Sequence, residues 1–286
     1  MCDVSSLVLL LLLAIPSATS ATTPASNSSA DVLLSFLAAM PLASQRLLLP
    51  SWNTSAGGMG NGNGPHCAFL GVTCSATGAV AALNLSGMGL SGDLAASAPL
   101  LCSLPELAVL DLTGNNFTGT VPPALASCSA LSALVLGQNG LSGALPPELL
   151  SSHQLRKIDL NSNALDGEIP APSAGGLPLL QYLDLSNNSF SGEIPLELTA
   201  LPALSLLDLS SNKLSGPVPD FPEHCVLEVL CVYTNMITGE LPHSLGNCGN
   251  LTKLLVSSNK ISGSLPDFRL PSRFLRLHAT PAKAVP

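Results

Sequence analysis

Residues 183–195 read LDLSNNSFSGEIP, and close variants of this segment recur along the chain. The copies are LDLTGNNFTGTVP from Leu110, IDLNSNALDGEIP from Ile158 and LDLSSNKLSGPVP from Leu207. A segment that returns at a nearly fixed interval predicts a repeat architecture, in which each unit buries its apolar face against its neighbours.

An asparagine occupies the same position in seven copies, with spacings of 24, 24, 25, 24, 23 and 24 residues. The seven are Asn115, Asn139, Asn163, Asn188, Asn212, Asn235 and Asn259. An earlier copy, LNLSGMGLSGDL, has Met88 at this position and should be irregular. Because an amide side chain both donates and accepts hydrogen bonds, we expect these asparagines to satisfy backbone groups where the chain turns inward, forming a structural ladder.

Two apolar residues spaced by two precede each asparagine, as Leu183 and Leu185 do before Asn188. This spacing places both side chains on one face of a short strand, so stacked copies build a parallel sheet with a buried leucine face. Each unit ends in glycine, an apolar residue and proline (absent from the first copy), which turn the chain toward the convex side. The predicted fold is an α/β repeat solenoid, a right-handed superhelix of about eight repeats with its parallel β-sheet on the concave face.

The charge of the chain argues against two classes of partner. A net charge of −8 and the lack of basic runs argue against binding nucleic acid or an anionic membrane.

Other features of the sequence point to a secreted protein. Residues 1–21 predict a secretory signal peptide, although they contain Asp3 and no lysine or arginine. A membrane anchor is the competing interpretation, but the apolar stretch at 7–15 is too short to cross a bilayer. Six sequons are candidate glycosylation sites: Asn27, Asn53, Asn84, Asn116, Asn187 and Asn250.

The cysteines fit the same compartment, because seven remain once one of the eight leaves with the signal peptide. We predict a disulfide between Cys67 and Cys74, which closes a short segment before the repeats. Cys128 and Cys248 lie at matching repeat positions, so we expect them to be buried as small apolar residues rather than bridged. Three cysteines are left unassigned: Cys102, Cys225 and Cys231. A disulfide between Cys225 and Cys231 is one alternative.

No catalytic constellation is recognisable in the sequence. The hexapeptide GMGLSG at 87–92 matches the dinucleotide-binding pattern, but it is the turn of the first repeat and no suitable helix or acidic residue follows. The five histidines show no metal-ligand spacing, and neither a nucleophile elbow nor paired catalytic carboxylates are found. We therefore expect a protein that is not an enzyme and that uses no cofactor or metal.

Function is then expected on the strand face that points away from the core, which solenoids use for binding. Asp159, Asp184 and Asp208 occupy the same position in three consecutive repeats and so predict an acidic column. Two interpretations stay open: a site for the basic group of a partner, or solvated consensus residues of the repeat. Further outward-facing candidates for ligand contact are Lys157, Tyr182, Tyr233 and Lys253.

The L-x-G-x-[IL]-P ending resembles the plant-specific class of extracellular leucine-rich repeats. The preceding segment, with an apolar stretch at 32–49, SWN at 51–53 and HCAFLGVTC at 66–74, is similar to the amino-terminal cap of plant leucine-rich-repeat receptor-like kinases and receptor-like proteins. The resemblance implies three regions after the signal peptide: a cap at 31–77, about eight repeats at 78–266 and an atypical tail at 267–286.

By this resemblance the chain is expected to be the ligand-sensing part of a plant receptor-like kinase, binding a secreted peptide or protein ligand or a co-receptor ectodomain. After Pro266 the sequence shows neither an apolar run of about 20 residues nor kinase motifs, so we expect a fragment or a soluble decoy. It would be extracellular, or at the plasma membrane if a longer product carries a span and a kinase. The alternative is a secreted defence protein that inhibits microbial cell-wall-degrading enzymes, although such inhibitors normally end in a cysteine-containing cap.

Overall fold

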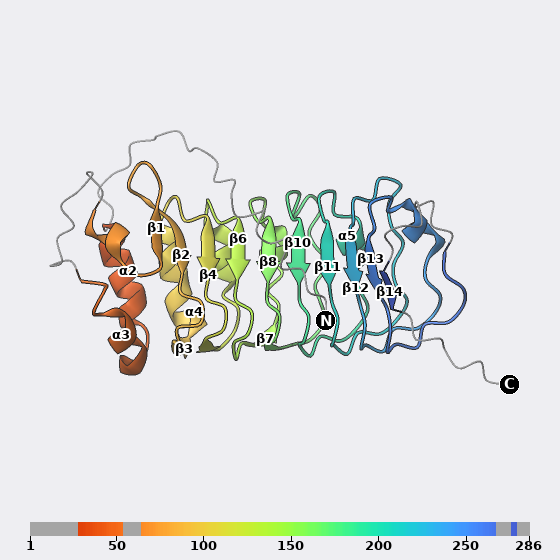
Figure 1. The fold of residues 1–286 in the computed structure, drawn as a ribbon, viewed down its shortest axis with the longest axis horizontal. Helices are drawn as coiled ribbons and strands as arrows, with labels where there is room; N and C mark the ends of the chain where they lie inside the picture. The colour runs from red at the N-terminus through yellow and green to blue at the C-terminus, as the bar shows by residue number, and fades with distance from the viewer. Residues whose placement is uncertain (1–27, 54–63, 267–275, 279–286) are drawn as a thin grey trace.

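The protein is described by a computed structural model covering residues 28–53, 64–266 and 276–278. The expected signal peptide at 1–21 and the sequon at Asn27 lie outside these residues. Within the described part, the chain winds through successive turns whose strands stand side by side along the long axis of the molecule (Figure 1).

One sheet of ten strands runs the length of the molecule. In sheet order the strands are β1 (Val72–Cys74), β2 (Val80–Asn84), β4 (Val109–Asp111), β6 (Ala133–Val135), β8 (Lys157–Asp159), β10 (Tyr182–Asp184), β11 (Leu206–Asp208), β12 (Val229–Cys231), β13 (Lys253–Leu255) and β14 (Arg276–His278). β1 pairs antiparallel with β2, and all later neighbours are parallel, with Leu183 beside Ile158 and Leu207. The predicted leucine-rich solenoid with a long parallel sheet is confirmed.

β14 adds a strand inside the segment expected to be an atypical tail. Its backbone pairs in parallel with β13, and Leu277 lies beside Leu254. The separation of 23 residues (277 − 254) falls within the spacing of the repeat asparagines. The tail therefore supplies one further strand at the interval of the repeat.

Two smaller sheets lie after the asparagine turns, each a parallel pair from consecutive repeats: β3 (Ser91–Asp93) with β5 (Asn116–Thr118), and β7 (Ser142–Ala144) with β9 (Ala164–Asp166). The glycine of the repeat ending lies at this level. Gly192 has a φ of +77°, and a Cβ there would lie 2.9 Å from Cγ of Glu168 in the preceding repeat. Glycine is required both by the left-handed turn and by the side chain that lies across it.

The helices are short apart from those of the cap. They are α2 (Ser29–Ala38), α3 (Leu42–Leu48), α4 (Leu94–Ser97) and α5 (Leu196–Thr199), with 3₁₀ turns η1 (Pro65–Ala68), η2 (Ala98–Ser103), η3 (Pro123–Ser127), η4 (Leu149–Ser151) and η5 (His243–Asn247). Prolines precede or begin most of the repeat turns, and a proline at a first helical position is favoured because its missing N–H has no partner to lose there. The turns close the leucine core on the side away from the ten-stranded sheet.

The cap, which contains α2, α3 and η1, covers the amino-terminal end of this core (Figure 1). A reciprocal capping box begins α2, in which Ser28 Oγ accepts from the Asp31 N–H and the Asp31 carboxylate accepts from the Ser28 N–H. Trp52 is 1% exposed, stacks on Phe69 with ring centroids 5.5 Å apart, and donates its indole N–H to the Leu70 carbonyl. The aromatic pair thus covers the first strands with its polar atom satisfied.

Each repeat asparagine joins its own turn to the preceding repeat. The Asn139 amide nitrogen donates to the carbonyls of Leu136 and Gly137 at 3.0 and 3.1 Å, and to that of Leu112 one repeat earlier at 3.0 Å. Its Oδ1 accepts from the Phe117 N–H at 3.0 Å, also one repeat earlier. Equivalent bonds recur at the other six asparagines of the series. The contacts between successive repeats therefore pass through the backbone.

The disulfide predicted between Cys67 and Cys74 is present. It joins η1 to β1, with the two Cα atoms 5.6 Å apart. The bond ties the cap to the first strand of the sheet, which is the arrangement that the cap resemblance implies.

Two further disulfides correct the sequence-based expectations. Cys128 and Cys248 are not unpaired apolar residues: Cys128 bonds Cys102 and Cys248 bonds Cys225, with Cα–Cα distances of 4.5 Å in both. The alternative of a Cys225–Cys231 bridge is also wrong. The physical reason is the stacking itself, because residues one repeat apart, here separated by 26 and 23 positions, lie side by side on neighbouring turns.

Replacement of Asn139 by aspartate should destabilise the protein by about 3 kcal/mol. The change keeps the size of the side chain but removes the donors to three buried carbonyls, and an unsatisfied buried group costs about 1–3 kcal/mol. Urea unfolding of the full chain measures the loss, with Gln154→Glu, an exposed amide-to-acid change, as the control. Equal stability of the Asn139 variant and the control would contradict the role of the amide.

Removal of the inter-repeat disulfides should cost about 3 kcal/mol each, because each closes a loop of roughly one repeat in the unfolded chain. The double variants Cys102→Ser/Cys128→Ser and Cys225→Ser/Cys248→Ser are each other's matched control, since their loop lengths are similar. Urea midpoints measured for both should fall by comparable amounts. A shift smaller than experimental error in either variant would show that its bond does not constrain the repeat stack.

Candidate functional site

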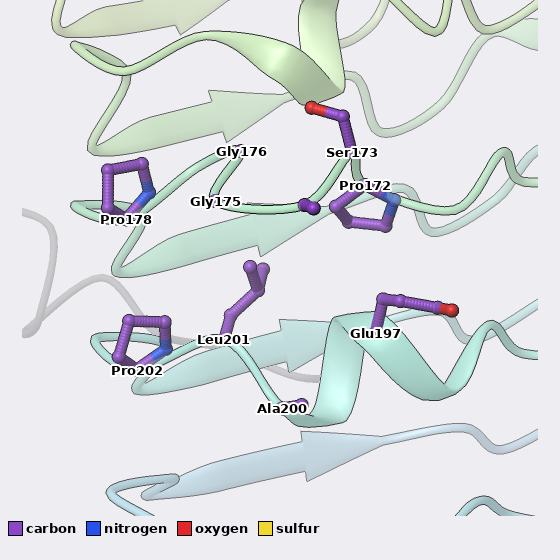
Figure 2. Close-up of a pocket in the computed structure, with 10 residues that line it drawn as sticks. Pro172, Ser173, Gly175, Gly176, Pro178, Glu197, Ala200, Leu201 and Pro202 are labelled. Atoms are coloured by element: carbon purple, nitrogen blue, oxygen red, sulfur yellow. The ribbon is translucent and has the colours of Figure 1, made fainter.

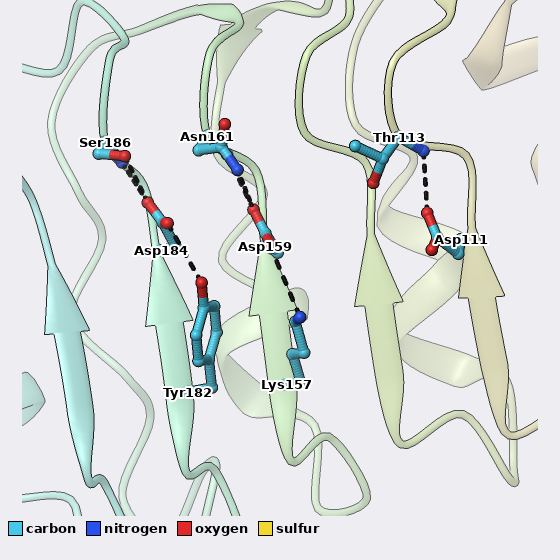
Figure 3. Close-up of polar contacts among 8 residues, drawn as sticks. All are labelled: Asp111, Thr113, Lys157, Asp159, Asn161, Tyr182, Asp184 and Ser186. Atoms are coloured by element: carbon cyan, nitrogen blue, oxygen red, sulfur yellow. Dashed lines mark hydrogen bonds and ion pairs between the residues drawn. The ribbon is translucent and has the colours of Figure 1, made fainter. Parts of the chain in front are cut away.

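The concave face carries parallel columns of side chains, because the strands of the sheet are in register. The central column contains Asp111, Val135, Asp159, Asp184, Asp208, Cys231 and Leu255. Asp159, Asp184 and Asp208 are direct neighbours across β8, β10 and β11, so the acidic column expected from the sequence is brought together. Figure 3 shows its first part, with one polar side chain beyond each aspartate toward the end of the strand.

Each aspartate is held by the residue two positions later. The Asp184 carboxylate accepts from the Ser186 N–H at 2.9 Å and from its hydroxyl at 2.6 Å. Asp208 accepts in the same way from the N–H of Ser210 at 2.9 Å and from its hydroxyl. These local bonds fix the carboxylates in one orientation, with one oxygen of each bound to its own strand end.

Lys157 compensates one end of the column. Its Nζ lies 3.8 Å from the Asp159 carboxylate and 4.5 Å from the centroid of the Tyr182 ring, so it makes an ion pair and a cation–π contact together. The Tyr182 hydroxyl donates to Asp184 at 3.3 Å (Figure 3). Lys157 therefore neutralises Asp159, whereas Asp184 is stabilised by neutral donors alone among these contacts.

The face becomes apolar beyond the aspartates. A cluster separate from the leucine core gathers on β10 to β13, with Tyr233 packed against it; its buried members are Tyr182, Leu206, Val229, Cys231 and Leu255. The acidic column is predicted from the sequence, whereas this apolar half of the face is not among the predicted contacts. The repeat register would have revealed it, since Cys231 and Leu255 replace aspartate at the central position.

The expectation that the candidate side chains are exposed is wrong for most of them. Tyr182 and Asp208 are each 3% exposed, and Lys157, Asp159 and Asp184 are buried as well, whereas Tyr233 and Lys253 are half-buried. Side chains of adjacent strands stand about 4.8 Å apart and cover one another, as the Lys157 ammonium covers the Tyr182 ring. Pointing away from the core is therefore not equivalent to being exposed.

Burial shifts the titration of the column. Burial, and after it the charges of Asp208 and Asp159, raise the pKa of Asp184 to about 7, against the bonds from Ser186. Burial also raises the pKa of Asp159, opposed by Lys157, and that of Asp208, opposed by the bonds from Ser210. Burial therefore disfavours the charged form of all three carboxyl groups, and a cation placed among them would favour it.

Three side chains in the cap lie close enough together to hold a metal ion, but their chemistry does not suit one. Atoms of His66, Cys67 and Cys74 lie within 4.8 Å of one another. Both sulfurs are in the disulfide, and a His66 ring nitrogen lies 3.0 Å from the Gly78 carbonyl oxygen. A disulfide offers no thiolate to a metal, so the group is structural.

The sequons of the described region are on the surface, where Asn53, Asn84, Asn116, Asn187 and Asn250 are all exposed. Asn84 lies beside Asp111, at the head of the central column. Glycosylation at these residues stays a prediction, and a glycan at Asn84 would border the first part of the central column, at Asp111.

Asp184→Asn should reduce the pH dependence of stability. Because the folded pKa of Asp184 is raised above its ordinary value of 3.8, its contribution favours folding below about pH 4 and is lost as the pH rises through 7. The wild type should lose about 2 kcal/mol from this group between pH 5 and pH 8, and the variant much less. Thermal unfolding at both pH values tests this, with Asp166→Asn on the exposed surface as the control. Identical slopes for wild type and Asp184→Asn would contradict the burial of an uncompensated carboxyl group.

Comparisons with known proteins agree with this architecture. A leucine rich repeat N-terminal domain model matches residues 26–75, and leucine rich repeat models match 153–214, 106–128 and 250–268. Residues 26–75 include the α2, α3 and Cys67–Cys74 region, so the matched cap coincides with the disulfide-closed segment.

Among solved structures, the leucine-rich-repeat ectodomain of the Arabidopsis thaliana membrane receptor kinase GASSHO1/SCHENGEN3, in complex with CASPARIAN STRIP INTEGRITY FACTOR 2, is 30% identical with a TM-score of 0.65, over 83% of this chain and 30% of that one. The plant peptide hormone receptor RGFR1, in complex with RGF2, is 32% identical with a TM-score of 0.58, over 62% and 28%. A chain of the Arabidopsis thaliana BIR3–SERK2 complex is 29% identical with a TM-score of 0.50, over 64% and 93%. The chain thus spans less than a third of the two receptor ectodomains.

Proposed function

The chain belongs to the plant leucine-rich-repeat proteins with an amino-terminal cap, and we propose that it is an extracellular recognition module whose concave face binds a secreted peptide or protein, or a co-receptor ectodomain, through a basic group. Its fold resembles the ectodomains of peptide receptors, and the proteins of that kind named above were solved with a peptide hormone or an integrity factor bound. The family is one of binding modules, and the role of this chain is argued from its own concave face.

The observation that carries the proposal is the column of three adjacent carboxylates with one paired lysine. Asp159, Asp184 and Asp208 are in register on neighbouring strands, and Lys157 is committed to Asp159. Asp184 and Asp208 repel each other when both are ionised, and the charge of Asp208 adds to burial in raising the pKa of Asp184. A guanidinium or ammonium group that reaches this pair relieves the repulsion and gains charge-assisted hydrogen bonds.

The apolar cluster beside the column supplies the second half of the recognition. β10 and β12 are two strands apart in the sheet, which is about 10 Å, and an extended peptide covers this distance in about three residues. A ligand running across the strands would therefore carry a basic residue and, three residues later, an apolar one that meets Val229, Tyr233 and Leu255. The half-buried side chains of Asn161, Ser186 and Tyr233 offer the outer contacts of the face.

An extracellular setting fits the rest of the molecule. Three disulfides between described cysteines favour an oxidising compartment. The exposed sequons agree with the signal peptide expected at 1–21. In the part of the chain that the structure covers, no helix is both long and apolar enough to cross a membrane.

The peptide acetyl-Ala-Arg-Ser-Ser-Leu-Ala-amide should bind the full chain, and the same peptide with glutamine for arginine should bind about tenfold more weakly, because a hydrogen bond to a charged group contributes about 1.5–3 kcal/mol. Isothermal titration calorimetry gives both dissociation constants. Asp208→Asn should weaken the arginine peptide to the level of the glutamine peptide.

Asp220→Asn is the matched control, since Asp220 is exposed and lies outside the strands of the ten-stranded sheet. It should leave the affinity unchanged. If the two peptides bind equally, or if both aspartate variants have the same effect, then the acidic column does not recognise a basic group.

A further inference from the structure

A hollow on the side of the solenoid away from the ten-stranded sheet is independent of the concave face. It has a volume of about 360 Å³, within the usual range of ligand sites, and lies between two consecutive repeats. One wall is the loop at 172–178 and the other is α5 with the turn that follows it, including Leu201 and Pro202 (Figure 2).

One wall of the hollow is a loop in place of the helical turn that the two adjacent repeats have. The described chain contains no helix between β9 and β10, where the sequence is PAPSAGGLP at 170–178. The preceding repeat has η4 and the following one has α5 at the same level. Prolines and two glycines therefore replace a helix and leave space beside α5.

The loop wall is packed and hydrogen-bonded against the preceding repeat. A Cβ on Gly176 would lie 2.5 Å from the Leu150 carbonyl oxygen of the preceding repeat, so the backbone is packed against that repeat. The Gly176 N–H donates to Ser173 at 2.7 Å and the Leu177 N–H donates to Ser152 at 2.9 Å. Gly175, by contrast, has nothing within 4 Å of its Cβ position and faces open space.

The lining is apolar at one end and acidic at the other. Figure 2 shows Pro178 and Pro202 at one end, with the Leu201 side chain pointing toward the Gly175–Gly176 backbone, and Glu197 at the far end. Glu197 is the charged residue of this lining, and its carboxylate makes no hydrogen bond or ion pair with another residue in the described ranges. Such a lining suits an apolar group held next to a cation.

A second hollow of about 530 Å³ repeats the acidic feature two repeats earlier, between η3 and η4. It is lined by Glu148, which is 49 residues before Glu197. Glu148 lies two residues after Pro146, as Glu197 lies two residues after Pro195. His153 also lines it, whereas no histidine lines the hollow at Glu197. Glu148 therefore provides a matched control for Glu197.

We propose that the hollow at Glu197 is a docking site for a partner protein that presents an aromatic side chain next to an arginine. The ring lies against Pro178, Leu201 and Pro202, and the guanidinium pairs with Glu197. Charge complementarity selects this occupant, because the lining offers a carboxylate and no cation within a chain of net charge −8. The aliphatic stem of arginine covers the remaining apolar surface while its head stays at the edge.

The test uses acetyl-Trp-Arg-amide as the probe and the full chain with ¹⁵N-labelled glycine. Progressive shifts of the Gly175 and Gly176 amides are expected, with millimolar affinity. Glu197→Gln should weaken binding about threefold, as for an exposed ion pair, and acetyl-Trp-Gln-amide should bind the wild type as weakly. Ala200→Phe, at an exposed lining position, should fill the hollow and abolish the shifts.

Glu148→Gln should leave the affinity measured at Gly175 and Gly176 unchanged. The proposal is overturned if the arginine and glutamine probes bind equally, or if Glu148→Gln and Glu197→Gln have the same effect. It is also overturned if the shifts appear at Gly137 on the concave side instead, a result that would favour the proposed function of the acidic column. If the probe does not bind at the hollow, the proposed role of the acidic column is still tested separately, by the titration with the arginine and glutamine hexapeptides.

Discussion

Every other feature of this protein depends on the backbone of one repeat stacking in register on the next. The repeat asparagines enforce that stacking, since each donates to carbonyls in its own turn and in the preceding one and accepts an N–H from the preceding one. Leucine packing alone would tolerate small slips, because apolar contacts have no direction. Directional bonds between the amide and buried backbone groups do not, since a slip would leave those groups unsatisfied.

The register explains features that have no connection in the sequence. Residues one repeat apart become spatial neighbours, so two pairs of cysteines fall within bonding distance, and three aspartates form a column. It also explains why Gly192 cannot be replaced freely, because Glu168 of the preceding repeat lies across it. In a solenoid, a substitution is therefore felt first by the same position of the adjacent repeats.

The sequence predicts the scaffold well because its determinants are periodic. The positions of Leu183, Asn188 and Gly192 recur in nearly every copy, and the strands, turns and cap follow from them. The disulfides Cys102–Cys128 and Cys225–Cys248 do not follow from the repeat pattern alone, because periodicity assigns positions within one repeat and not contacts between two. The burial of Tyr182 does not follow from the pattern for a related reason: the side chains that cover it come from neighbouring strands.

The candidate sites lie where the periodic pattern is broken or is free to vary. The central column changes from Asp208 to Cys231 without disturbing the leucine core, because this face is not part of that core. The loop at 172–178 departs from the helical turns on either side and leaves a hollow that the asparagine bonds do not require. Buried carboxylates near one another are costly to fold, and the rigid stack bears that cost. A partner's cation would offset part of that cost, which is the physical basis of the recognition proposed for the acidic column.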